Sequence, residues 1–178
     1  MKLGGHGKSS ILTEELKEKI HKELDYKYQV LFDVLWFSCC RVSEALQIRW
    51  CDVSGNTIII RKSTTKNKQE TREILVPQYL IDKINKLPNT CSYIFAGYSG
   101  SHLSRYSADK NLRNACKKLG LVGYSTHSYR RSGITQLHEQ NIPIKVISTI
   151  SGHRSLASIS HYIEVDDKQV ANALQARW

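Results

Sequence analysis

The 178-residue sequence contains no apolar run long enough to cross a bilayer. Its longest one, residues 30–40, is interrupted by Asp33, whereas a membrane-spanning helix needs about 20 mainly apolar residues. The chain also lacks a start that combines a basic region, an apolar run and a cleavage site, so no secretory signal is recognised. We therefore expect a cytoplasmic protein without a membrane partner.

The cysteine pattern supports neither a disulfide framework nor a zinc site. The count is odd, and no two cysteines form a C-x-x-C pair. A reducing compartment is the default for such a chain, and we expect no metal and no other cofactor. The five cysteines are Cys39, Cys40, Cys51, Cys91 and Cys116.

Acidic residues are scarce relative to basic ones. The chain has 16 Asp and Glu against 26 Lys and Arg, a formal net charge of +10. This excess indicates an acidic partner, and nucleic acid is the leading candidate because each neutralised phosphate releases counterions. Charge alone does not decide the matter, because a basic surface can also be merely solvated.

Residues 126–162 carry the strongest chemical signal. His127 and Arg130 are three residues apart, so on a helix they share a face. His153 follows a glycine, which suits a tight turn or a helix entry. Tyr162 lies nine residues further on, which on one straight helix is roughly 13 Å along the axis, so a bend is needed to bring the two together. Such a group suits a phosphate, with cationic donors for its oxygens and a phenol to attack phosphorus.

The order H-x-x-R, then G-H, then Tyr resembles the catalytic core of the tyrosine recombinase (phage integrase) family. That family also has an earlier arginine in an R-[IV]-S-E-[AL]-L segment, which here is residues 41–46, and a lysine in a hairpin turn between the two motifs. The place after Arg130, where the family often has a second histidine, is taken by Arg131, whose role stays open. The resemblance implies this catalytic set: Arg41, Lys66, His127, Arg130, His153 and Tyr162, with Glu44 supporting Arg41.

The resemblance implies an α+β fold, a mainly helical catalytic domain with a small antiparallel sheet or hairpin, shared with type IB topoisomerases. Two β-branched runs, residues 56–61 and 71–76, predict that hairpin, with a polar, basic turn between them. The turn contains Lys62, Lys66 and Lys68. Counting back from the strand that starts at Arg72 favours Lys66 as the family's lysine, with Lys68 as the alternative.

The implied reaction is phosphoryl transfer without metal or ATP. Arg41 and Arg130 would fork onto the non-bridging oxygens of the scissile phosphate, the two histidines would add hydrogen bonds, and His127 could accept the phenol proton. Tyr162 would attack phosphorus, Lys66 would protonate the departing 5′-oxygen, and a 3′-phosphotyrosyl bond would result.

Domain layout and partners also follow from the resemblance. We expect residues 1–10 to be a flexible leader or linker, and residues 11–178 to be the catalytic domain without the family's N-terminal DNA-clamping domain. Double-stranded DNA is the expected partner. The resemblance also implies a homo-oligomer, a tetramer on DNA, with the tail after residue 166 docking in trans, and an association with the nucleoid. The alternatives are a type IB topoisomerase and a DNA-binding protein whose site no longer cuts; a metal-dependent nuclease is disfavoured because no carboxylate cluster lies near the motif.

Overall fold

The computed structural model describes residues 9–65, 70–153, 155–160 and 175. Within that part, the strands are β1 (Val53–Ser54), β2 (Thr57–Ile60) and β3 (Arg72–Leu75), and short 3-10 turns are η1 (Trp50–Asp52), η2 (Lys62–Thr64) and η3 (Tyr98–Gly100). The helices are α1 (Glu14–Lys22), α2 (Tyr26–Ser38), α3 (Val42–Ala45), α4 (Gln78–Asn85), α5 (Arg105–Lys118), α6 (Thr126–Glu139), α7 (Ile144–Ser151) and α8 (Leu156–Ser160).

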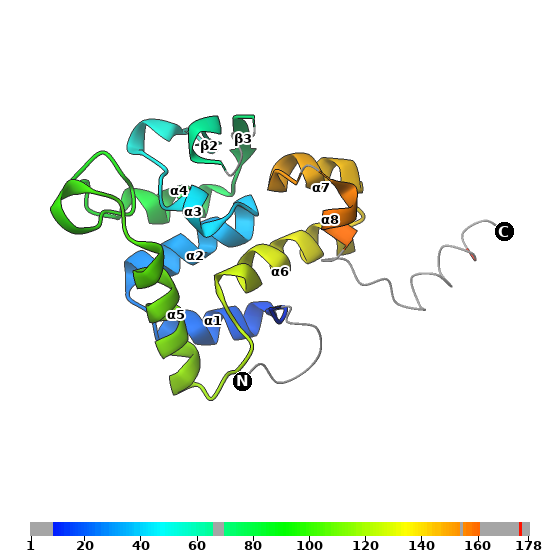
Figure 1. The fold of residues 1–178 in the computed structure, drawn as a ribbon, viewed down its shortest axis with the longest axis horizontal. Coiled ribbons are helices and arrows are strands. Elements are labelled where there is room, and N and C mark those ends of the chain that lie inside the picture. The colour runs from blue at the N-terminus through cyan, green and yellow to red at the C-terminus, as the bar shows by residue number, and fades with distance from the viewer. Residues whose placement is uncertain (1–8, 66–69, 154, 161–174, 176–178) are drawn as a thin grey trace.

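Helix α2 is the centre of the fold. Its sequence is apolar on most sides, and the helix is accordingly buried between α3 and α4 on one side and α6 on the other (Figure 1). Gly133 allows α6 to approach closely, because a Cβ there would lie 2.1 Å from the carbonyl oxygen of Trp36. Next to that crossing, the buried ring of Tyr129 stacks on Phe32 at 4.9 Å between centroids. The longest apolar run of the sequence, residues 30–40, thus forms most of a buried helix.

The sheet is antiparallel, in the order β1-β2-β3. In its register Ile58 pairs with Ile74 and Ile60 pairs with Arg72. Side chains alternate across β3, so that Arg72 and Ile74 are buried whereas Glu73 and Leu75 are exposed. The expected hairpin is therefore confirmed, and the two-residue strand β1 extends it.

Helix α6 joins two hydrophobic clusters. Its first half packs into the main core with α2, and its second half contributes Ile134 to a smaller cluster with Cys39, Ile147 and Ile159. The latter two residues come from α7 and α8, which lie at the far end of α6 from α1 and α5 (Figure 1). The chain after α6 is thus held against the end of α2.

The N-cap of α6 differs from the one that the sequence favours. A threonine directly before His127 predicts Thr126 as the N-cap, but the N-cap is Ser125, whose backbone N–H donates to Ser128 Oγ at 3.1 Å. Thr126 lies inside the first turn, and its hydroxyl donates to Asp109 Oδ1 at 3.1 Å. The tail expected to dock in trans lies outside the described residues, apart from residue 175. No helix among the described residues is long and apolar enough to span a membrane.

Candidate active site

Arg41 stands at a sharp turn between two helices. Helix α2 ends at Ser38, its C-cap Cys39 has a left-handed backbone (φ 51°), and α3 begins one residue after Arg41. The Arg41 guanidinium donates from Nη1 to Glu44 Oε1 at 3.0 Å, and its backbone N–H donates to Glu44 Oε2 at 2.9 Å. Glu44 is only 1% exposed. Its carboxylate therefore fixes both the backbone and the side chain of Arg41, the geometry expected for a supporting residue.

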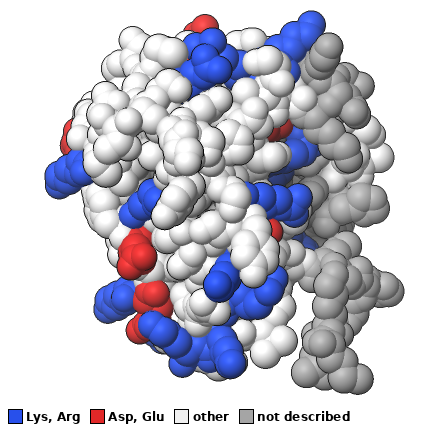
Figure 2. Space-filling model, turned by 60° about the vertical axis from the view of Figure 1, so that its left-hand side comes forward, with Lys and Arg blue, Asp and Glu red and all other residues white. Residues whose placement is uncertain are grey.

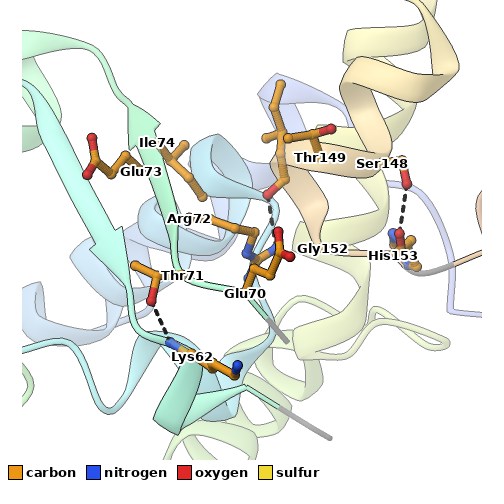
Figure 3. A pocket seen from close by; sticks show the side chains of 11 residues that line it. Lys62, Glu70, Thr71, Arg72, Glu73, Ile74, Ser148, Thr149, Gly152 and His153 are labelled. Carbon is orange, nitrogen blue, oxygen red and sulfur yellow. Dashed lines mark hydrogen bonds between the residues drawn. The ribbon is translucent and has the colours of Figure 1, made fainter. Parts of the chain in front are cut away.

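Glu44 also binds a second arginine, Arg72 of β3. Arg72 Nη2 donates to Glu44 Oε2 at 2.8 Å, and Nη1 donates to the carbonyl oxygen of Ile150 in α7 at 3.0 Å. Figure 3 shows the Arg72 side chain reaching from β3 to the chain around Gly152. Sequence reasoning used Arg72 only to mark the strand. The available signal was the period of two, which puts residue 72 on the same buried face as Ile74.

The first two turns of α6 carry His127, which is exposed, and Arg130, which is buried. Arg130 is buried, and its Nη2 lies 3.0 Å from His153 Nε2. His127 lines a hollow of about 220 Å³ between α5 and the start of α6, together with Arg105 and Arg113. Arg131 points elsewhere and donates to the carbonyl oxygen of Ser9 at 2.6 Å, which ties the start of the described chain to α6.

His153 follows the left-handed C-cap of α7, Gly152 (φ 68°). Its backbone N–H donates to the Ser148 carbonyl at 3.1 Å, and Ser148 Oγ donates back to the His153 carbonyl at 2.7 Å. On the ring, Nδ1 lies 2.7 Å from Ser151 Oγ, which itself donates to the Ile147 carbonyl. Ser151 therefore accepts from Nδ1–H, and Nε2 is left as the acceptor that faces Arg130.

Burial, reinforced by the positive charges of Arg130, Arg41 and Arg72, lowers the pKa of His153 to about 3. Burial, followed by the charges of Arg105 and Arg130, also lowers the pKa of His127. Both imidazoles are consequently neutral at pH 7. The site is a group of guanidinium ions around neutral histidines, an arrangement that attracts anions and offers them hydrogen bonds.

A cavity of about 680 Å³ opens beside His153, between β3 and α7. Its lining residues come from both elements and from η2 (Figure 3): Lys62, Glu70, Thr71, Arg72, Glu73, Ile74, Ser148, Thr149, Ile150, Gly152 and His153. Lys and Arg side chains are also spread over the molecular face drawn in Figure 2, with fewer Asp and Glu side chains among them. The cavity therefore has the cationic Lys62 and Arg72 on its β3 side and the neutral His153 on its α7 side.

The structure thus brings together most of the expected site. Arg41, Glu44, Arg130 and His153 form one cluster, and Arg41 and Arg130 also act on the pKa of His127. Lys66, its alternative Lys68, and Tyr162 lie outside the described residues. No group of three or more His, Cys, Asp or Glu residues that could hold a metal ion occurs in the described part of the chain.

Several solved DNA recombinases share this fold. The XerA recombinase superposes with a TM-score of 0.79 at 17% identity, covering 98% of this chain and 66% of that one. The XerH site-specific recombinase, solved with its palindromic difH substrate after cleavage, gives a TM-score of 0.75 at 21% identity, covering 98% of this chain and 54% of that one. At these identities the likeness establishes the fold.

Sequence comparison establishes the family. Residues 10–169 match the model of the phage integrase family, so the chain belongs to that family. Among curated relatives, tyrosine recombinase XerD of Corynebacterium glutamicum is 26% identical over 163 residues, covering 87% of this chain and 52% of the relative. The chain spans about half the length of the curated relatives it matches. The resemblance drawn from the motifs is confirmed.

Proposed function

We propose that this chain is the catalytic domain of a site-specific DNA recombinase that cuts and rejoins strands through a 3′-phosphotyrosine intermediate. The observation that carries the proposal is the contact between Arg130 and His153, at 3.0 Å, in a place where Arg41 and Arg72 also act on the imidazole. A pentavalent phosphate needs stabilisation of the negative charge on its equatorial oxygens. Buried guanidinium groups beside neutral imidazoles supply both charge and directed donors.

In this proposal Arg41 and Arg130 bind the non-bridging oxygens. His153 has its Nε2 directed at Arg130, so in the free site it orients that guanidinium as an acceptor. To donate to the phosphate, Nε2 must take up a proton, which the negative charge of the bound phosphate favours. His127, neutral because of burial and nearby arginines, is a base able to accept the phenol proton.

Tyr162 is the proposed nucleophile, and Lys66, with Lys68 as the alternative, is the proposed acid for the 5′-oxygen. Both lie outside the described residues, so the support is positional. Helix α8 ends at Ser160, two residues before Tyr162, and its Ile159 belongs to the same buried cluster as Cys39. That cysteine precedes Arg41 by two residues. The chain is therefore anchored near Arg41 shortly before it reaches Tyr162.

Double-stranded DNA is the proposed substrate, in keeping with the net charge of +10. We also propose a tetramer on DNA in which the tail after residue 166 docks on a neighbouring copy, and an association with the nucleoid. A chain ending at Asp166 tests the docking. If it assembles on DNA as well as the full chain, tail docking is wrong, while strand cleavage remains to be judged separately.

The function is tested with nicked suicide duplexes that tile the DNA flanking the coding sequence, followed by a denaturing gel. The expected result is a covalent protein–DNA adduct that forms in EDTA and disappears in Tyr162→Phe. Tyr106→Phe, at an exposed tyrosine of α5, is the matched control and should keep the adduct. An equally strong adduct in Tyr162→Phe contradicts the assignment. Cleavage that EDTA abolishes would indicate a metal-dependent nuclease, and site-independent relaxation of supercoiled DNA would indicate a topoisomerase.

A further inference from the structure

We propose that Arg72 is a positioning residue that sets where His153 meets the scissile phosphate, by tying the Arg41–Glu44 pair to the turn at Gly152 and His153. This inference rests on the proposed function, because it assigns a role within the same site. It concerns a residue of the sheet that the site motifs do not include. Arg72 would act through its neighbours rather than by touching DNA.

The Arg72 guanidinium bridges two elements, α3 and α7. Its side chain is 8% exposed, and its two terminal nitrogens point to different partners. One donates to Glu44 of α3 at 2.8 Å and the other to the Ile150 carbonyl of α7 at 3.0 Å. Because Glu44 also holds Arg41, a chain of contacts runs from Arg41 through Glu44 and Arg72 to the end of α7.

The turn that carries His153 closes directly on this guanidinium. A Cβ added to Gly152 would lie 2.1 Å from Arg72 Nη1 and 2.5 Å from its Cζ. The end of a flexible side chain can usually move aside, but here it is buried and hydrogen-bonded at both nitrogens. The Arg72 guanidinium therefore packs directly against Gly152 and limits the position of the turn, which includes the next residue, His153.

Stability alone does not explain an arginine at this place. Its Nε–H is buried and has no hydrogen-bond acceptor among the described residues, which costs stability. Replacing a buried ion pair with apolar residues of similar volume is often neutral or stabilising, and Ile74 fills the next inward place on β3. An apolar residue could not bind the Glu44 carboxylate and the Ile150 carbonyl in fixed directions, as the planar guanidinium does. The charge of Arg72 also helps to keep His153 neutral.

The test compares Arg72→Lys with Arg61→Lys. Lysine keeps the charge, but its single ammonium cannot reproduce the planar fork that spans Glu44 and Ile150. Arg61, on the chain just after β2, pairs with Asp52 away from the His153 turn and serves as the matched control. In a site of this kind a misplacement of about 1 Å can cost about 100-fold in rate.

For Arg72→Lys we expect single-turnover cleavage at saturating DNA to fall by about 10- to 100-fold, whereas DNA affinity in a gel shift should be unchanged. Arg61→Lys should match the wild type in both. In a His153→Gln background the further effect of Arg72→Lys should shrink, because the two residues act through one turn. Parallel losses of affinity and rate would mean that Arg72 contacts DNA directly, which overturns the proposal, as would wild-type cleavage.

A second measurement does not depend on cleavage. The backbone N–H groups of Gly152 and His153 both donate to the Ser148 carbonyl, so their hydrogen exchange reports on the turn. Arg72→Lys should speed exchange at these two amides and leave those of α2 unchanged. Unchanged exchange at the turn, or faster exchange throughout the protein, overturns a positioning role. If the wild-type chain forms no adduct, the proposed function fails, and exchange still decides whether Arg72 holds the turn.

Gly152→Ala is the complementary variant, because it displaces the turn without removing any charge. The added Cβ meets the Arg72 guanidinium, and the left-handed backbone is strained for alanine. As for Arg72→Lys, we expect the cleavage rate at saturating DNA to fall while the affinity for DNA stays unchanged. A Gly152→Ala chain that cleaves like the wild type contradicts the proposal.

Discussion

Replacing Glu44 with glutamine tests the centre of the site without adding bulk. Glu44 accepts hydrogen bonds from the backbone and guanidinium of Arg41 and from the guanidinium of Arg72. Glutamine offers one oxygen and one NH₂ group, so it cannot accept on both sides of its amide. At least one donor loses its acceptor, and both guanidinium ions lose the buried negative charge.

The expected loss of stability can be worked from exposure. Removing one partner of a buried ion pair typically costs about 3–5 kcal/mol. The Arg72 side chain is 8% exposed and cannot recover much hydration, whereas that of Arg41 is 25% exposed and can be partly solvated. The lower end, about 3 kcal/mol, therefore applies. With a urea slope of about 2 kcal/mol/M for a domain of this size, the unfolding midpoint should fall by about 1.5 M.

The assay is equilibrium urea unfolding followed by tryptophan fluorescence. Glu23→Gln is the matched control, because it removes a carboxylate from an exposed pair with Lys118, and its effect should stay below about 0.5 kcal/mol. The double variant Glu44→Gln/Arg72→Met should lose less than the sum of the two single variants, since the uncompensated charge leaves with its partner. If Glu44→Gln behaves like Glu23→Gln, or the double variant is additive, Glu44 is not the shared counter-charge inferred here.

Three further predictions concern His153 and the α2–α6 contact. The pKa of His153 is near its ordinary 6.5 in the unfolded chain but about 3 in the folded chain, so only the unfolded chain gains a proton between these values. The free energy of unfolding should therefore be constant above pH 6.5 and fall as the pH drops toward 3. The melting temperature of His153→Gln should fall less over this pH range than that of the wild type. Ser151→Ala removes the acceptor of Nδ1–H and should cost about 1 kcal/mol, with a changed tautomer balance in the imidazole ¹⁵N shifts. Gly133→Ala forces a Cβ against the Trp36 carbonyl and should lower the free energy of unfolding, measured in urea, by about 1–3 kcal/mol. An unchanged unfolding midpoint would mean that α2 and α6 can move apart to admit the methyl group without loss of stability.

Much of the fold could be predicted because the elements have strong local patterns. The β-branched runs around Ile58 and Ile74 give the hairpin, and the apolar stretch that follows Tyr28 gives the buried helix. Helices α7 and α8 are separate, since α7 ends at Ser151 and α8 begins at Leu156, but Tyr162 lies outside the described residues, so the bend that brings it to His153 stays a prediction. Strand β1 could not be predicted in this way, because two residues are too few to show the alternation of apolar and polar side chains. The strand forms through its pairing with β2.

The errors and omissions have tertiary causes. Ser125 and Thr126 both carry a hydroxyl suited to an N-cap, and Asp109, which is distant in sequence, engages Thr126. Arg131 had no role readable from the motif, because its acceptor is the backbone of Ser9. Arg72 was hidden for a similar reason. Its inward direction follows from strand alternation, but its partners lie on two helices far along the chain.

Gly152 shows how a correct local interpretation can still miss half of the physical reason. A glycine before the histidine indicates a tight turn, and the observed φ of 68° agrees. Asparagine also tolerates that backbone region, so the turn alone would accept either residue. The 2.1 Å approach to Arg72 does not, because any Cβ would enter the guanidinium. Gly152 and His153 therefore lie where two halves of the site meet, one built on α3 and β3 and the other on α6 and α7. Gly152→Asn should keep the turn but push these two halves apart.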